Sequence, residues 1–149
     1  MDINVERDIW DVFHDGSIAS AEVEGSATAR VKIEIEYLRE MFEDPGDSFY
    51  LHLEECSALS FRPVDSAETF SSAKIASLDL QILSAAEDEV LPLRVFCVGG
   101  TVQSPVYGYL ELVYASSNVT LDTGRHVPVS ELFAACGKYW DDWSTRRGQ

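Results

Sequence analysis

Residues 27–37, ATARVKIEIEY, alternate apolar and polar side chains with a period of two residues. Successive side chains of a β-strand point to opposite faces of its sheet, whereas a helix repeats about every 3.6 residues. The pattern therefore predicts a strand with one buried and one solvated face, which is typical of an antiparallel sheet. The apolar face would carry Ala29, Val31, Ile33, Ile35 and Tyr37, and the polar face Arg30, Lys32, Glu34 and Glu36.

The same alternation recurs in SFYLHLEE at residues 48–55. Pro45 and Gly46 favour a turn between these two strands, and Gly124 in LDTGRHV predicts a hairpin because glycine readily takes a positive φ. Asp15 and Gly16 predict a further turn that leads into a strand. The opening VERDIWDVF is either a short helix or irregular chain, and the polar stretch 63–72 is expected to hold a helical turn over a sheet edge. More strands are expected in ALSFR, SLDLQIL, PLRVFCV, YGYLELVYA and NVTL.

The chain ends in a different pattern, with apolar side chains at helical spacing between residues 132 and 143. Ser130 is a suitable N-cap, so we expect a helix over about residues 130–144. Its buried stripe would include Trp140 and Trp143, and Gly137 would allow close approach to a sheet. The predicted fold is α+β and mainly β, an antiparallel sheet or two-layer β structure covered by one C-terminal helix, in a single domain spanning residues 1–149.

The charge of the chain is strongly negative, with 26 acidic residues, 11 basic residues and a formal net charge of −15. Such a surface repels nucleic-acid phosphates and anionic lipids, and it speeds encounter with basic partners, although solubility alone also accounts for it. The N-terminus lacks the apolar core of a signal peptide. Cys56, Cys97 and Cys136 are odd in number and widely spaced, as expected for reduced thiols. We therefore expect a cytoplasmic protein that binds neither nucleic acid nor membrane.

Catalytic and metal-binding patterns are not found in the sequence. His14, His52 and His126 lie far apart and fit no metal-ligand spacing, and no serine nucleophile elbow or phosphate-binding loop is present. The carboxylates beside Cys56 would raise its pKa, which disfavours a nucleophilic thiolate. We interpret His14 and Asp15 as a turn, with a polar contact at a binding surface as the open alternative. The sequence predicts no cofactor and no metal, and it favours binding over catalysis.

Four stretches carry a resemblance to known proteins: FHDGSI, IEIEYLREMF, LHLEEC and LDTGRHVPVSELFAACGKYWDDW. Through them the chain resembles a family of small acidic bacterial cytosolic proteins along nearly its whole length. None of these motifs is a catalytic signature, so the resemblance implies no activity. The chain is more loosely similar to immunity proteins of bacterial toxin systems, which are also small, acidic and single-domain. That likeness transfers no site residues.

These observations together predict a non-enzymatic acidic binding protein, of which an immunity-type protein is one form, that engages a basic protein partner. The alternative is a small-molecule-binding protein or enzyme with a pocket near His14, His52 and Cys56. A subunit that self-associates through a sheet edge or the aromatic helix is a third class, and the sequence leaves the oligomeric state open. The candidate partner-binding residues are Glu34, Glu36, Glu43, Asp44, Asp47, Tyr50 and His52.

Overall fold

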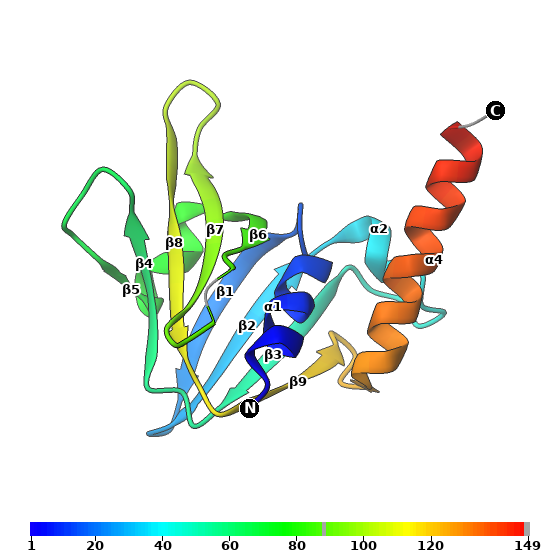
Figure 1. Ribbon diagram of the computed structural model, residues 1–149, viewed down its shortest axis with the longest axis horizontal. Coiled ribbons are helices and arrows are strands. Elements are labelled where there is room, and N and C mark those ends of the chain that lie inside the picture. Colours follow the sequence, from blue (N-terminus) through cyan, green and yellow to red (C-terminus); the bar gives the residue numbers. More distant parts are fainter. Residues whose placement is uncertain (88, 148–149) are drawn as a thin grey trace.

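The computed structural model describes residues 1–87 and 89–147, and Figure 1 shows their arrangement. The predicted mainly β fold with an antiparallel sheet and a C-terminal helix is confirmed. The helical elements are α1 (Ile3–Val12), α2 (Glu36–Arg39), α3 (Ser72–Ile75), the 3₁₀ turn η1 (Ala76–Leu78) and α4 (Val129–Arg147). The strands are β1 (Ser17–Glu24), β2 (Thr28–Glu34), β3 (Ser48–Glu54), β4 (Ala58–Pro63), β5 (Phe70–Ser71), β6 (Gln81–Ala85), β7 (Leu93–Gly100), β8 (Pro105–Val113), β9 (Ser116–Leu121) and β10 (His126–Val127).

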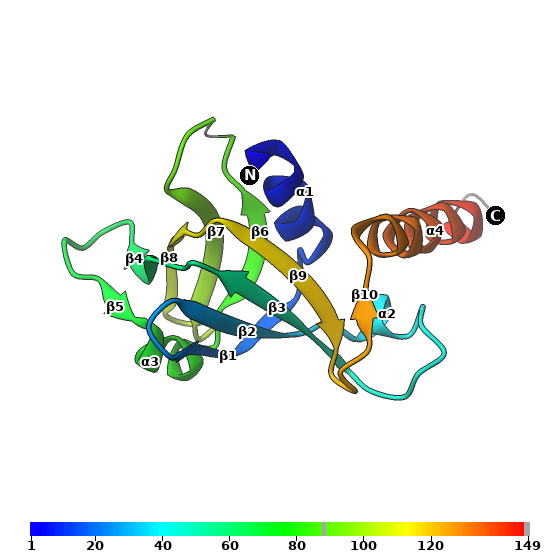
Figure 2. The ribbon, with the colours of Figure 1, turned by 90° about the horizontal axis from the view of Figure 1, so that it is seen from below.

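The sheet has the strand order β10-β9-β3-β2-β1-β6-β7-β8-β4-β5, and it bends back on itself where β3 continues into β4 and β8 into β9. Strand β3 runs into β4 and β8 into β9 across short bends, while β3 pairs with β9 and β4 with β8. Backbone hydrogen bonds continue across the bends, from Ala115 N to Glu54 O at 2.9 Å and from Ser57 N to Val113 O at 2.8 Å. The sheet therefore closes around one continuous apolar core, as the curved strands in Figure 2 show.

The alternation that predicted the first pair of strands is present in β2, where Val31 and Ile33 are completely buried and Glu34 is exposed. The predicted continuation of this strand to Tyr37 is wrong, because β2 ends at Glu34 and α2 follows. The turn into α2 brings Leu38 fully into the core, where an extended chain would have placed it on the solvated face. Tyr37 is consequently only partly buried and packs against the margin of the core.

Helix α1 supplies the main helical contribution to the core. Its residues Ile9 and Trp10 and the following Phe13 are at most 1% exposed. The indole N–H of Trp10 donates to the Tyr114 hydroxyl at 3.2 Å, and that hydroxyl donates to the carboxylate of Glu6 at 2.9 Å. These bonds give the buried indole N–H of Trp10 a hydrogen-bond partner, and they fix α1 to the bend between β8 and β9.

Helix α4 confirms the predicted C-terminal helix, but only its first turns pack against the body. Leu132 is fully buried, whereas Trp143 is 37% exposed and the helix extends away from the sheet in Figure 1. The expected burial of Trp143 is therefore wrong. A Cβ at Gly137 would meet no atom within 4 Å, so this glycine does not serve close approach to a sheet. Neither α4 nor any other helix in residues 1–87 and 89–147 has the length and apolar character needed to span a bilayer.

The predicted turns are present, with one shift in position. Gly124 has a φ of 97° in the turn that joins β9 to β10, and Asp15 has a φ of 70° in the turn that precedes β1. The helical turn expected in residues 63–72 begins only at Ser72, where α3 starts. Its position follows from Ile75, which is fully buried beneath this turn, whereas residues 64–69 offer no comparable apolar anchor.

Candidate partner-binding site

Residues 34–47, EIEYLREMFEDPGD, connect the end of β2 through α2 to the start of β3, and we call them the acidic segment. Arg39 is the single base of the segment. Five of the six acids are exposed and Asp44 is half-buried. The acidic residues are Glu34, Glu36, Glu40, Glu43, Asp44 and Asp47.

The side chain of Arg39 is completely buried and binds the acidic segment from beneath. Its Nη1 donates to Asp44 O at 2.7 Å, its Nη2 to Pro45 O at 2.9 Å, and its Nε to Ser48 O at 3.2 Å. Nη2 also donates to a carboxylate oxygen of Asp122 at 2.9 Å. Because the only base of the segment is used inside the protein, the exposed acids have no neutralising partner within the segment.

Asp122 completes this support from the turn after β9. Its second carboxylate oxygen accepts from the backbone N–H groups of Asp47 at 3.0 Å and Ser48 at 3.3 Å. Burial by itself would raise the pKa of Asp122, but these N–H groups and Arg39 together hold the pKa below its ordinary value. Gly46 has a φ of 151°, and a Cβ there would collide with the Asp122 carboxylate and the Arg39 guanidinium. The loop is therefore held in one shape.

Two adjoining hollows lie over the acidic segment, with volumes of about 390 Å³ and about 450 Å³. Both are lined by Glu34, Glu36 and Glu40, and no cationic side chain is among the lining residues. Asp15 adds a carboxylate to the first hollow and Asp47 one to the second. None of the three shared glutamates forms an ion pair within residues 1–87 and 89–147, so their negative potential is directed to solvent. We call these two spaces the acidic hollows.

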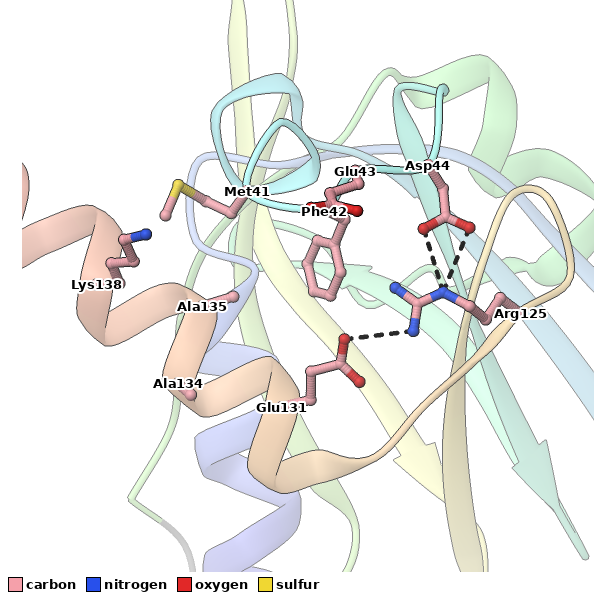
Figure 3. A pocket seen from close by; sticks show the side chains of 9 residues that line it. All are labelled: Met41, Phe42, Glu43, Asp44, Arg125, Glu131, Ala134, Ala135 and Lys138. Carbon is pink, nitrogen blue, oxygen red and sulfur yellow. Dashed lines mark hydrogen bonds and ion pairs between the residues drawn. The ribbon is translucent and has the colours of Figure 1, made fainter.

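A third hollow of about 460 Å³ lies between residues 41–44 of the acidic segment and α4 (Figure 3). Here Arg125 ion-pairs with Asp44 at 3.2 Å and with Glu131 at 3.3 Å, and its guanidinium lies 5.7 Å from the centre of the Phe42 ring. Lys138 adds a second cation to the lining. The charges of this hollow are therefore largely compensated, which distinguishes it from the acidic hollows.

An aromatic ladder begins in the first acidic hollow and continues along α4. We define it as Tyr37, Tyr139, Trp140 and Trp143. The ring centres are 4.5 Å apart for Tyr37 and Tyr139, 5.9 Å for Tyr37 and Trp140, and 5.5 Å for Trp140 and Trp143. The Tyr37 hydroxyl donates to His14 O at 2.9 Å, and burial followed by the charge of Asp15 raises the pKa of Tyr37. The ladder therefore joins the acidic hollow to the exposed ring of Trp143.

The acidic candidates from the sequence fall within this one region. Glu34, Glu36 and Asp47 line the acidic hollows, while Glu43 and Asp44 line the third hollow. Contiguity in the sequence is enough to bring these five residues together. Asp44 differs from the rest because Arg125 already neutralises it.

Tyr50 and His52 belong to a different surface, the outer face of β3. The guanidinium of Arg30 lies 4.8 Å from the centre of the Tyr50 ring, and the ammonium of Lys32 lies 5.9 Å from it. His52 Nε2 and Thr120 Oγ1 share a hydrogen bond of 3.0 Å, and burial followed by the charge of Arg30 lowers the pKa of His52. These two side chains therefore lie among charges of both signs, since Arg30 and Lys32 are close to the Tyr50 ring and the charges of Glu24 and Glu54 also act on His52.

Two carboxylates and one aromatic ring of the first acidic hollow were not among the sequence candidates, namely those of Asp15, Glu40 and Tyr37. Glu40 follows Glu36 by four residues, so the helical reading of α2 would have placed both on one face. Tyr37 was assigned to the core because the strand pattern was extended too far. Asp15 comes from a distant turn, and no local signal in the sequence connects it with the acidic segment.

The three residues of the alternative pocket have different surroundings. His14 lies with its Nδ1 2.8 Å from Asp11 O and stacks on Trp140, with ring centres 5.3 Å apart. The Cys56 thiol donates to a backbone carbonyl, and burial raises its pKa. No hydrogen bond, ion pair or ring contact joins any two of His14, His52 and Cys56 in the described part of the chain. Over the same residues, no group of three His, Cys, Asp or Glu side chains is arranged to hold a metal ion.

Comparisons of the chain with protein-family models, with curated proteins and with solved structures find no match. A function for this protein therefore has to be inferred from the geometry and the charge of its own surface.

Proposed function

We propose that the protein is a non-enzymatic binding protein whose acidic hollows receive a basic segment of a protein partner. The observation that carries this proposal is the uncompensated charge of Glu34, Glu36 and Glu40, which both hollows share. An arginine or lysine side chain entering the first hollow meets several carboxylates and the ring of Tyr37. Such a cation gains both ion pairs and a cation–π contact.

The protein itself contains two guanidinium groups held in this manner. Arg30 pairs with Glu22 at 2.9 Å and Glu24 at 3.6 Å, and it lies over the Tyr50 ring. Arg125 repeats the arrangement in the third hollow, between two carboxylates and over a phenyl ring. The first acidic hollow offers carboxylates and an aromatic ring in the same combination, and among the residues that the structure describes no cation lines it. This chemistry supports a cationic side chain of a partner as its occupant.

The net charge of −15 supports the same partner class, because complementary charge raises the association rate and excludes nucleic acid as a competitor. An immunity-type role is one form of this function, in which the bound partner is a basic toxin. The cytoplasm is the compartment proposed, since Cys56, Cys97 and Cys136 are all free thiols.

The test compares two variants with the same change in net charge. The tagged protein is used at low salt to recover a partner from lysate of the native host, and the recovered protein is then purified. Its dissociation constant is measured against the triple variant Glu34→Gln, Glu36→Gln, Glu40→Gln. The matched control is Glu54→Gln, Glu68→Gln, Glu87→Gln, which neutralises three exposed glutamates outside the acidic segment.

We expect the site variant to weaken binding about tenfold, since each exposed ion pair contributes about 0.2–1 kcal/mol. The control should stay within about twofold of the unaltered protein. Equal losses in both variants would mean that only net charge matters and would contradict a defined site. Failure to recover any basic protein at low salt would contradict the proposed function.

A further inference from the structure

The hairpin of β7 and β8 extends beyond the closed sheet, as its long loop in Figure 1 shows. Residues 95–110, VFCVGGTVQSPVYGYL, contain no acidic residue, no basic residue and no histidine, although 37 of the 149 residues of the chain are charged (26 acidic and 11 basic). We call these residues the uncharged finger. Absence of charge over such a length is unusual in this chain, and the finger is exposed at its tip, where Val102 is 100% exposed.

The outer face of the uncharged finger is aromatic. The ring centre of Phe96 lies 5.9 Å from that of Tyr107 and 5.3 Å from that of Tyr109. Tyr107 is 45% exposed, and the backbone of Val64 bonds to Tyr107 O, which places a further exposed apolar residue beside it. Patches of aromatic residues depleted of charge are typical of the centres of protein interfaces.

The border of the patch carries charges of both signs, and the exposed Asp79 lines the hollow beside Val102 and Tyr107. Arg62 pairs with Tyr109 across β4 and β8, and its Nε lies 3.1 Å from a carboxylate oxygen of Glu111. A two-fold contact between two copies brings each residue of the patch against the same patch on the other copy. An uncharged patch with a mixed border is complementary to itself, whereas the acidic segment would meet its own charge.

The patch and the acidic segment are separated by strands of the same sheet, and Ser17 lines both the hollow beside Tyr107 and the second acidic hollow. Strand pairing runs from Tyr107 to Val98, Gln81, Ser17 and Glu34, which is four steps across the sheet. At about 4.8 Å for each step, the distance along the sheet is about 19 Å. The Debye length is about 8 Å at physiological ionic strength, so repulsion between the acidic segments is largely screened across such a contact.

We propose that the uncharged finger is a homodimer interface, in which the aromatic face of one copy packs on that of a second copy. A second copy fits because two chains of −15 charge repel each other least where they meet through a segment that carries no charge of its own. The acidic hollows remain open in such a dimer, so each dimer presents two of them. The interface does not depend on the proposed function.

The test is sedimentation equilibrium of the full chain over a range of concentrations at about 0.1 M and about 1 M salt. We expect a mass that rises from monomer to dimer with concentration, and tighter dimers at high salt because screening weakens the repulsion between like-charged chains. Tyr107→Lys and Val102→Lys should each weaken the dimer, the first by about tenfold or more, as for a central aromatic of an interface. Val23→Lys is the matched control, since Val23 is 52% exposed on β1.

All three variants lower the net negative charge by one, so a change in overall charge cannot explain a dimer that only the finger variants weaken. A monomer mass at every concentration and both salts would overturn the proposal. A dimer that tolerates both finger variants, or that is weakened equally by Val23→Lys, would also overturn it. Circular dichroism and a thermal melt establish that each variant is folded.

Discussion

Replacing Arg39 by methionine would remove the group that holds the acidic segment in place. The guanidinium is completely buried and donates five hydrogen bonds, three to the backbone carbonyls of Asp44, Pro45 and Ser48 and two to Asp122. Methionine keeps the apolar part of the side chain, so the substitution tests the charged end. It leaves three carbonyls without this donor and a carboxylate that is only 19% exposed without its counterion.

Removing one partner of a buried ion pair destabilises a protein by about 3–5 kcal/mol, since the remaining charge is left unpaired. We therefore expect Arg39→Met to lower the free energy of unfolding by about 3–4 kcal/mol. With a urea m-value of about 1.5 kcal/mol per M, the unfolding midpoint would fall by about 2 M. A total stability of about 5–15 kcal/mol is typical of a domain, so the variant should remain measurable.

Equilibrium urea unfolding followed by circular dichroism gives this quantity directly. The double variant Arg39→Met, Asp122→Asn serves as the control, because it removes the unpaired carboxylate as well. We expect the double variant to lose about 1–3 kcal/mol less than the sum of the two single losses. A loss below about 1 kcal/mol for Arg39→Met, or strict additivity of the two substitutions, would refute the proposed support of the acidic segment.

Three further predictions concern single side chains. The pKa of Asp122 is lowered in the folded protein, so its contribution to stability is present above its unfolded pKa of about 4 and is lost as the pH falls through its folded pKa. The variant Asp122→Asn should therefore be less stable than the unaltered protein at pH 7 and should lose less stability on acidification. Urea unfolding between pH 7 and pH 3 would measure both differences. Tyr114→Phe should cost about 1–3 kcal/mol in the same assay, because it leaves the buried Trp10 N–H and Glu6 carboxylate without their shared partner; an unchanged midpoint would contradict that network. Gly137→Ala should raise the melting temperature, with a gain of about 0.5–1 kcal/mol, because Gly137 is helical and its Cβ position is empty; a lower melting temperature would show that the glycine is required.

The parts of the fold that the sequence predicts are those set by local periodicity. Alternation identified the strands around Val31 and Leu51, and Gly124 identified the last hairpin. Periodicity could not reveal that β2 stops at Glu34, because the alternating pattern continues past the point where the chain turns. Burial of Leu38 and Arg39 makes the chain turn into α2 after Glu34, and the partner of Arg39 lies 83 residues away at Asp122. No local pattern contains that pairing.

The same distinction applies to the candidate site. Five of its acids are neighbours in the sequence, and their common location therefore followed from the sequence. The aromatic ladder was not predictable in this way, since Tyr37 and Trp140 come from separate segments and meet only when α4 packs against α2. The helical stripe that suggested burial of Trp143 was real, but α4 extends beyond the surface that could cover it.

The central claim is that the acidic hollows bind a basic protein partner, and the salt dependence of the association rate tests it most directly. The rate constant of the purified partner would be measured by stopped-flow between about 0.1 M and about 1 M salt, where the Debye length falls from about 10 Å to about 3 Å. We predict a steep fall for the unaltered protein and a shallower one for Glu34→Gln, Glu36→Gln, Glu40→Gln, with the control variant close to the unaltered protein. A rate constant that is independent of salt, or a slope that the site variant leaves unchanged, would contradict the claim.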